Sequence, residues 1–472
     1  MSYAELIRQE GEYTYSANIQ FDITTDTKLL RYIPNETSIT LLREYFLDIT
    51  RAHPYNHARI LYGSYGTGKS HFLTVLAQIL EKTFTTGVAF STFLSRVKEY
   101  DEALAYDIKS FAETVERKPM LVVPIVFDFD DFDRCIYFSL KKKLDALGIS
   151  IHYKTFFDQA SSLLRQWQSS QESSDRLAQA CKAAKLDLDE LTRNLELLNP
   201  KAEKSFNKLF EAMTYGVKFV YEASNMFEIL NQTNDAIKEN YNGIVFIFDE
   251  FGRYIEDNLK KIRVKAVQDF AEYCDHCDGN NHIILVSHKE ISQYTEHHSK
   301  SVSAEWKKVE GRYKAFSINS KQDQSLDIIR SVLLKNEPVW SNFKLTFMRD
   351  LADMYSTAID FRGYSIRQGD ENPYEAAFPL HPFSLYALDR LSKKVAQNDR
   401  TFFTYLAGKE PNSLYRFLAQ MPIDEFHYVG IDEIFDYFEP SIKSVQSDDT
   451  FEWYKRLQSA LAKGNLDEYG KV

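Results

Sequence analysis

The sequence has few cysteines, no long apolar run and no excess of basic residues. No stretch of about 18 uncharged apolar residues occurs, so a membrane-spanning helix is not expected. Four cysteines in 472 residues are too few for a disulfide framework, and the first residues are charged and lack an apolar leader segment. We therefore predict a cytoplasmic protein without membrane contact. The net charge of −11 argues against DNA binding through a broadly basic surface, although a local basic groove stays open.

Strand-like apolar runs alternate with helical segments over the first two thirds of the chain. With 44% hydrophobic and 26% charged residues, the composition is that of a soluble globular protein, and the length implies two or more domains. The alternation predicts an α/β fold, a parallel five-stranded sheet with helices on both faces. The expected strands lie within residues 59–62, 120–134, 243–257, 282–290 and 313–319.

Changes in periodicity divide the chain further. Residues 1–55 are expected to form a lead-in packed on the core, and residues 56–320 to form the α/β core itself. The polar stretch 150–240 is rich in helix formers and predicts a helical insertion within that core. Residues 321–425 predict an α-helical domain, and residues 426–472 the start of a further segment that we expect to be truncated.

Residues 63–71 are the first stretch of the sequence that indicates a functional site. Glycines at 63 and 68 bracket four residues and precede Lys69 and Ser70, which is the pattern G-x-x-x-x-G-K-[ST] of a phosphate-binding loop. A short strand precedes it and an amphipathic helix follows, so backbone N–H groups would face a phosphate. We expect Lys69 to reach the β- and γ-phosphates and the Ser70 hydroxyl to bind Mg²⁺. The alternative is a glycine-rich helix start with a solvated lysine. The predicted nucleotide contacts are Gly63, Ser64, Tyr65, Gly66, Thr67, Gly68, Lys69, Ser70 and His71.

Two adjacent carboxylates, Asp249 and Glu250, end the apolar run that begins at residue 243. The carboxyl edge of an open α/β sheet is where such folds bind ligands. Asp249 is predicted to hold Mg²⁺, directly or through water, and Glu250 to orient the water that attacks the γ-phosphate. Solvated loop carboxylates are the alternative.

The phosphate loop and this carboxylate pair resemble the Walker A and Walker B motifs of the AAA+ superfamily and related P-loop ATPases. The resemblance implies ATP and Mg²⁺ as ligands and a P-loop NTPase core with a helical lid. It implies a sensor 1 residue at Ser287 or His288, where the next strand ends. It also implies an arginine finger at Arg312, since "VEGRYKAFSIN" is similar to the element before the last core strand. A surface pairing of Arg312 with Glu310 is the alternative.

The segment 378–414 resembles a lid segment of the large P-loop ATPases of bacterial phage-defence systems, of the BREX and phage-growth-limitation type. That resemblance implies a sensor 2 arginine at Arg400, or otherwise at Arg390, and a defence complex as the setting. Self-association or partner subunits would follow, with DNA as an indirect partner. Three functions stay open: an ATPase that drives conformational change, a nucleotide-dependent switch or scaffold with little turnover, and an origin-recognition-like loader acting on DNA.

One further motif has metal-ligand spacing. Cys274 and Cys277 form a C-x-x-C pair with His276 and His282 nearby. A zinc site needs four well-placed ligands and no second pair follows, so a helix end before the turn "DGNN" is the preferred interpretation.

Overall fold

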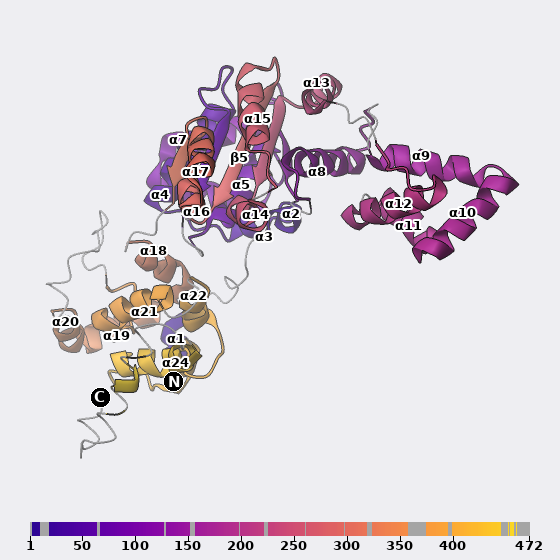
Figure 1. Cartoon of the computed structure of the whole chain (residues 1–472). Coiled ribbons are helices and arrows are strands. Elements are labelled where there is room, and N and C mark those ends of the chain that lie inside the picture. Colours follow the sequence, from indigo (N-terminus) through magenta and orange to yellow (C-terminus); the bar gives the residue numbers. More distant parts are fainter. Residues whose placement is uncertain are drawn as a thin grey trace.

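The protein has three parts, an α/β core, a helical insertion that projects from it and a helical domain (Figure 1). In the part of the chain that the structure describes, no helix has the length and apolar character needed to cross a bilayer. The computed structural model describes residues 2–9, 18–63, 67–126, 129–151, 156–197, 199–220, 225–259, 261–296, 298–318, 323–356, 374–394, 399–444, 452, 454–456 and 459.

A parallel sheet of five strands forms the centre of the core, in the order β3-β4-β5-β2-β6. The predicted sheet is thereby confirmed, and the fold is that of a P-loop NTPase. Strand β5 lies between β2, which leads into the phosphate loop, and β4, which ends one residue before Asp249. Because all five strands run parallel, the carboxyl ends of β2 and β4 lie at the same edge of the sheet. They are about 10 Å apart, which is two strand spacings. The strands are β2 (Ala58–Tyr62), β3 (Leu121–Pro124), β4 (Gly243–Phe248), β5 (Asn280–Ser287) and β6 (Lys314–Ser317).

Helices cover both faces of this sheet. Every residue of β4 is buried, and its side chains alternate between the two apolar clusters, which explains the continuous apolar run in its sequence. One face packs against α4, α5, α6 and α7, and the other against α8, α13, α14, α15 and α17. The core helices are α2 (Ile19–Asp22), α3 (Thr27–Leu30), α4 (Glu36–Ile49), α5 (Lys69–Leu80), α6 (Val88–Tyr100), α7 (Glu102–Glu113), α8 (Phe132–Ala146), α13 (Met226–Ile237), α14 (Phe251–Asn258), α15 (Val264–His276), α16 (Ile291–Thr295) and α17 (Lys300–Glu310).

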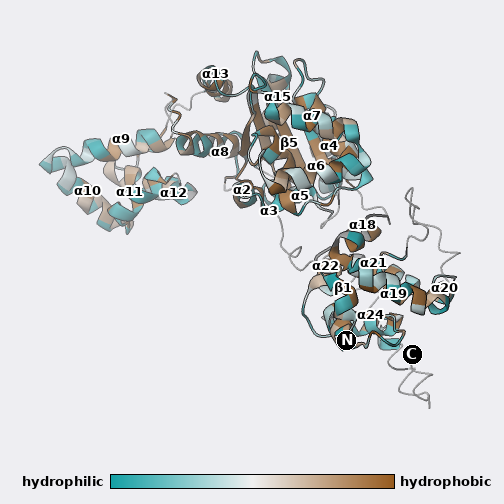
Figure 2. Ribbon diagram, turned by 180° about the vertical axis from the view of Figure 1, so that it is seen from behind, coloured by the Kyte–Doolittle hydropathy of each residue, from teal (hydrophilic) through white to brown (hydrophobic). Residues whose placement is uncertain are grey.

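The predicted helical insertion extends sideways from the core beyond α8 (Figure 1). Figure 2 shows the strands of the sheet in brown and much of the insertion in teal, as expected for a largely polar arm. Aromatic side chains pack between the helices of the insertion. The ring of Trp167 stacks on that of Phe206, with 6.0 Å between the ring centres. An ion pair of 2.6 Å between Arg134 in α8 and Glu203 joins the arm to the core. Its helices are α9 (Phe156–Gln168), α10 (Gln171–Ala184), α11 (Leu188–Glu196) and α12 (Pro200–Met213).

The helical domain contains both ends of the described chain. In Figure 1 the indigo helix α1 lies among the orange and yellow helices. Strand β1 pairs antiparallel with β7, and the backbone N–H of Tyr3 donates to the carbonyl of Met421 at 3.0 Å. The elements are α1 (Tyr3–Leu6), β1 (Ile7–Gln9), α18 (Asp323–Val332), β7 (Leu333–Lys335), α19 (Glu337–Thr346), α20 (Met348–Ser356), α21 (Pro382–Lys394), α22 (Asp399–Ala407), α23 (Leu414–Gln420) and α24 (Ile431–Ser444).

Two of the expected boundaries therefore differ from the structure. Residues 2–9 do not pack on the α/β core as residues 19–49 do, because Tyr3, Leu6 and Ile7 bury their side chains in the helical domain instead. Helix α24 belongs to the same apolar cluster, so residues 431–444 are part of this domain and not the start of another. In sequence, the α/β core is inserted into the helical domain.

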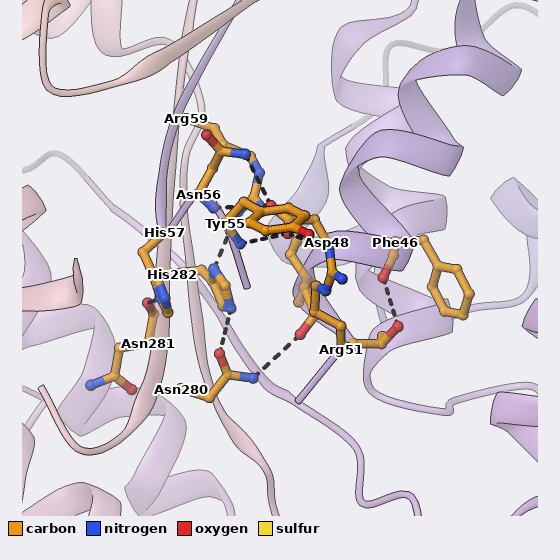
Figure 3. A network of polar contacts seen from close by, with 12 residues as sticks. Phe46, Asp48, Arg51, Tyr55, Asn56, His57, Arg59, Asn280, Asn281 and His282 are labelled. Carbon is orange, nitrogen blue, oxygen red and sulfur yellow. Dashed lines mark hydrogen bonds and ion pairs between the residues drawn. The ribbon is translucent and has the colours of Figure 1, made fainter. Parts of the chain in front are cut away.

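A buried polar network fixes β2 at the sheet edge opposite the phosphate loop (Figure 3). Arg59 is fully buried and donates to Asp48 at 2.8 Å and to Nδ1 of His282 at 3.2 Å. Nε2 of His282 then donates to Asn280 at 2.8 Å, and the imidazole stacks on His57 at 4.7 Å. Burial and the Arg59 charge hold the pKa of His282 well below its usual range, so the ring stays neutral.

Candidate active site

The phosphate loop leaves β2 through Gly63, where a side chain would collide with the backbone of Ile318. A Cβ at Gly63 would lie 2.9 Å from Cγ2 of Ile318 and would clash with the Ile318 carbonyl oxygen. Gly68 has a φ of +79° and stands as the N-cap of α5, in the left-handed region that favours glycine. Three of the predicted contacts, Ser64, Tyr65 and Gly66, lie outside the described residues.

Lys69 and Ser70, which open α5, both turn toward the carboxyl edge of the sheet. The Lys69 side chain is buried, and its Nζ donates to the Gly63 carbonyl at 2.5 Å. The Ser70 hydroxyl donates to Oδ2 of Asp249 at 2.8 Å, joining residues 179 positions apart in the sequence. The structure thus brings together three of the predicted site residues.

Asp249 is a carboxylate whose surroundings disfavour its charge. Burial raises its pKa, against the hydrogen bonds from Ser70 and from the Glu250 backbone N–H, which lower it. The hydroxyl of Ser70 and the carboxylate of Asp249 are hard oxygen donors, the ligand type that Mg²⁺ prefers. A cation would also relieve the cost of the buried negative charge, so these two residues fit the ion.

Asp249→Asn is therefore expected to stabilise the protein in the absence of Mg²⁺ and nucleotide. The amide keeps the shape and can still accept from Ser70, but it carries no buried charge, so the melting temperature should rise by roughly 1–3 °C at neutral pH. A carboxyl whose pKa is raised in the folded state loses its stabilising contribution as pH rises through that pKa. The gain should accordingly be full above the raised pKa of Asp249, shrink as the pH falls through it, and be absent once the pH reaches the usual pKa of aspartate. Thermal melts from pH 4 to 8 check this, and a lower melting temperature at pH 7.5 would contradict it.

Glu250 follows with a φ of +57° and is the N-cap of α14. Its carboxylate is partly exposed and lies 3.4 Å from Nη1 of Arg253, one helical turn further on. The left-handed backbone turns Glu250 out of the strand direction while Asp249 stays beside Ser70. The two adjacent carboxylates therefore occupy different environments, Asp249 against the start of α5 and Glu250 on the more exposed side, next to Arg253.

The two sensor 1 candidates have different surroundings. The Ser287 hydroxyl donates to the Lys289 carbonyl at 2.7 Å, so it is engaged within its own loop, and the Ser287 carbonyl accepts from Gly63 N–H at 3.3 Å. Burial and the nearby Lys69 charge lower the pKa of His288 to about 4. The Lys69 charge therefore acts on the His288 imidazole, whereas the Ser287 hydroxyl is engaged within its own loop.

His71 directs its side chain away from the phosphate loop. Its Nε2 donates to the Lys28 carbonyl at 2.7 Å, and the ring packs edge-on against Tyr32 at 5.2 Å. Burial lowers its pKa to about 4. The imidazole thus joins α5 to the N-terminal segment of the core, and only the backbone N–H of His71 is placed to contact a phosphate.

Arg312 forms an ion pair with Glu272 in α15, and not with Glu310, which instead accepts from the Ser292 N–H at 2.7 Å. Arg312 precedes β6, whose residue Lys314 pairs with Arg59 at the start of β2. It therefore lies toward the sheet edge opposite Gly63, beyond the roughly 13 Å that separates Arg59 from Gly63 along β2 at about 3.3 Å per residue. In this geometry Arg312 cannot reach the phosphate loop of its own chain.

The remaining candidates lie outside the site or outside the described side chains. Arg400 is in the first turn of α22, and its side chain lies outside what the structure describes. Arg390 is exposed and stacks over Tyr386 at 5.2 Å. Across the described ranges, no group of three or more His, Cys, Asp and Glu side chains could hold a metal ion, the C-x-x-C segment included.

Comparison with known proteins adds little to this geometry. No family model matches the chain, and neither does any curated protein. Among solved structures, the chain is similar to the crystal structure of Cdc6p from Pyrobaculum aerophilum, with 11% sequence identity and a TM-score of 0.31. That match covers 92% of this chain and 89% of the other. At such a TM-score the likeness supports no statement on function, so the assignment to the P-loop NTPase fold rests on the strand order and the phosphate loop.

Proposed function

We propose that this chain binds ATP with Mg²⁺ and hydrolyses it, and that the nucleotide state changes the arrangement of the helical domain, the insertion or a partner subunit. The observation that carries the proposal is the contact of 2.8 Å between the Ser70 hydroxyl and the Asp249 carboxylate, beside the buried Lys69. This places a hydroxyl, a carboxylate and an ammonium group at the edge where P-loop folds bind nucleotides.

Each residue has a distinct role in this proposal. Lys69 exchanges the Gly63 carbonyl for phosphate oxygens, while the start of α5 supplies backbone N–H groups. Ser70 and Asp249 hold the Mg²⁺, which when bound offsets charge on the phosphates. Glu250, whose carboxylate is partly exposed beside Asp249, takes the proton of the attacking water.

The arginine finger is proposed to act between copies of the chain, because Arg312 lies at the edge opposite its own phosphate loop. We expect specific activity to rise with protein concentration and Arg312→Ala to bind ATP normally but lose that rise. Mixing Arg312→Ala with Glu250→Gln should recover part of the turnover, since each variant carries the part that the other lacks. Steady-state phosphate release across a concentration series measures both effects.

The matched control for this arginine is Glu272→Gln, which breaks the same ion pair but leaves Arg312 in place. It should retain the concentration dependence. Activity that is independent of concentration and untouched by Arg312→Ala would reassign the arginine to a structural pairing with Glu272.

The alternative function is a nucleotide-dependent switch or scaffold that binds ATP but hydrolyses little of it. Turnover measured with and without DNA distinguishes this switch from an ATPase and from a DNA loader. Stimulation by DNA would favour the loader. Membership of a phage-defence complex stays a prediction from the sequence resemblance.

A further inference from the structure

The hydroxyl of Tyr294 lies between two elements of the candidate site. Tyr294 belongs to α16, and its Oη accepts a hydrogen bond of 3.1 Å from the backbone N–H of His288. On its other side is Gly252, in the first turn of α14. A Cβ at that position would lie 2.6 Å from Cζ of Tyr294 and would clash with the hydroxyl oxygen. Because glycine has no side chain at position 252, the Tyr294 hydroxyl can lie directly against the backbone of α14.

A second contact joins the same two elements. The Lys289 Nζ lies 4.3 Å from the centre of the Tyr294 ring and 3.6 Å from a carboxylate oxygen of Glu256 in α14. The loop after β5 is therefore held against α14 by a hydrogen bond to Tyr294, by the close packing of Gly252 and by this bridging lysine.

Both of these elements carry residues of the candidate site, Glu250 at the start of α14 and the sensor 1 candidate His288 in the loop after β5. Glu250 is the N-cap of α14, two residues before Gly252, and its carbonyl accepts from the Tyr254 N–H at 3.1 Å within the first helical turn. His288 is the residue of the β5 loop that lies near Lys69. A movement of α14 relative to this loop would change the spacing between the water-activating carboxylate and the phosphate-facing side chains.

We propose that Tyr294 is a positioning residue for ATP hydrolysis, whose hydroxyl fixes the helix that carries Glu250 against the loop that carries His288. This inference rests on the proposed function. Tyr294 acts through the placement of α14 and the β5 loop, so it should contribute to the chemical step and not to ATP affinity. Small displacements of a catalytic group cost large factors in rate, because the reacting atoms must be aligned.

The test is Tyr294→Phe, which keeps the ring and the contact with Lys289 but removes the acceptor for the His288 N–H. We expect kcat to fall about tenfold, with KM for ATP and the equilibrium affinity for ATP changed by less than about twofold. Tyr273→Phe is the matched control, because Tyr273 is also half-buried and its hydroxyl donates a hydrogen bond to Asn231 at 2.7 Å, away from the site. That control should leave kcat unchanged.

Gly252→Ala provides an independent variant. Its methyl group forces Tyr294 away from α14, so it should also lower kcat more than it lowers ATP affinity. Adding Tyr294→Leu to Gly252→Ala removes the clashing atoms and should restore the melting temperature but not kcat.

Three results would overturn the inference. The first is a kcat for Tyr294→Phe that lies within twofold of the kcat of the parent, while Glu250→Gln still abolishes turnover. That result would contradict the role of Tyr294 but leave the proposed ATPase function intact. Another is an equal loss of kcat in Tyr273→Phe, which would indicate general destabilisation. A parent protein that binds no ATP and has no turnover would overturn the proposed function and this inference together.

Discussion

Lys69→Ala is expected to abolish ATP binding, with an affinity loss of about 100-fold or more, as is typical when one partner of a buried charge pair is removed. The Lys69 side chain is buried at the mouth of the phosphate loop, and its Nζ is held by the Gly63 carbonyl at 2.5 Å. Nucleotide phosphates would take over this ammonium group as their counter-charge. Titration calorimetry with Mg²⁺ and ATP measures the loss.

The control for this variant is Lys98→Ala, which removes a lysine of α6 from an exposed ion pair with Glu102 of α7. Surface pairs of this kind contribute little, so both stability and ATP affinity should stay near those of the parent. If Lys69→Ala bound ATP as tightly as this control does, the loop would be a glycine-rich turn and not a phosphate site.

Glu250→Gln is expected to keep ATP binding but to reduce turnover by roughly 10²–10⁴-fold, the usual contribution of a positioned general base. The amide preserves the size of the side chain and the N-cap geometry of α14, yet it is a poor proton acceptor for the attacking water. The variant should therefore trap ATP. Single-turnover phosphate release, read beside nucleotide binding, separates the two effects.

Asp257→Asn is the matched control, because Asp257 forms an ion pair with the same arginine. Its carboxylate lies 3.7 Å from Nε of Arg253, and the Glu250 carboxylate lies 3.4 Å from Nη1. Replacing this carboxylate should not change turnover. Equal turnover in Glu250→Gln and the parent would assign Glu250 to the Arg253 ion pair alone.

The sheet was predictable because its strands are buried on both faces. Continuous apolar runs such as residues 243–248 indicate such strands without tertiary information, and the order of motifs places the phosphate loop and Asp249 at one edge. The contact between Ser70 and Asp249 follows from that placement. Local sequence patterns were sufficient for this contact because the positions of Ser70 and Asp249 are set by the strands that precede them, β2 and β4.

Contacts set by packing between distant segments were not predictable. The apolar residues Tyr3 and Leu6 fit any hydrophobic core, and nothing in their spacing shows that they pack in the helical domain. The partner of Arg312 is Glu272, 40 positions earlier, although Glu310 is nearer in sequence. Tyr294 lies in a five-residue helix without a motif, so only the structure reveals its position between Gly252 and His288.

The most direct test of the account is Mg²⁺-dependent phosphate release from ATP by the purified chain, measured in parallel for the parent, Lys69→Ala and Glu250→Gln. The account predicts turnover in the parent that requires Mg²⁺, none in Lys69→Ala because ATP does not bind, and none in Glu250→Gln although ATP binds. Release at the parental rate by either variant, or parental release that is indifferent to Mg²⁺, would contradict it.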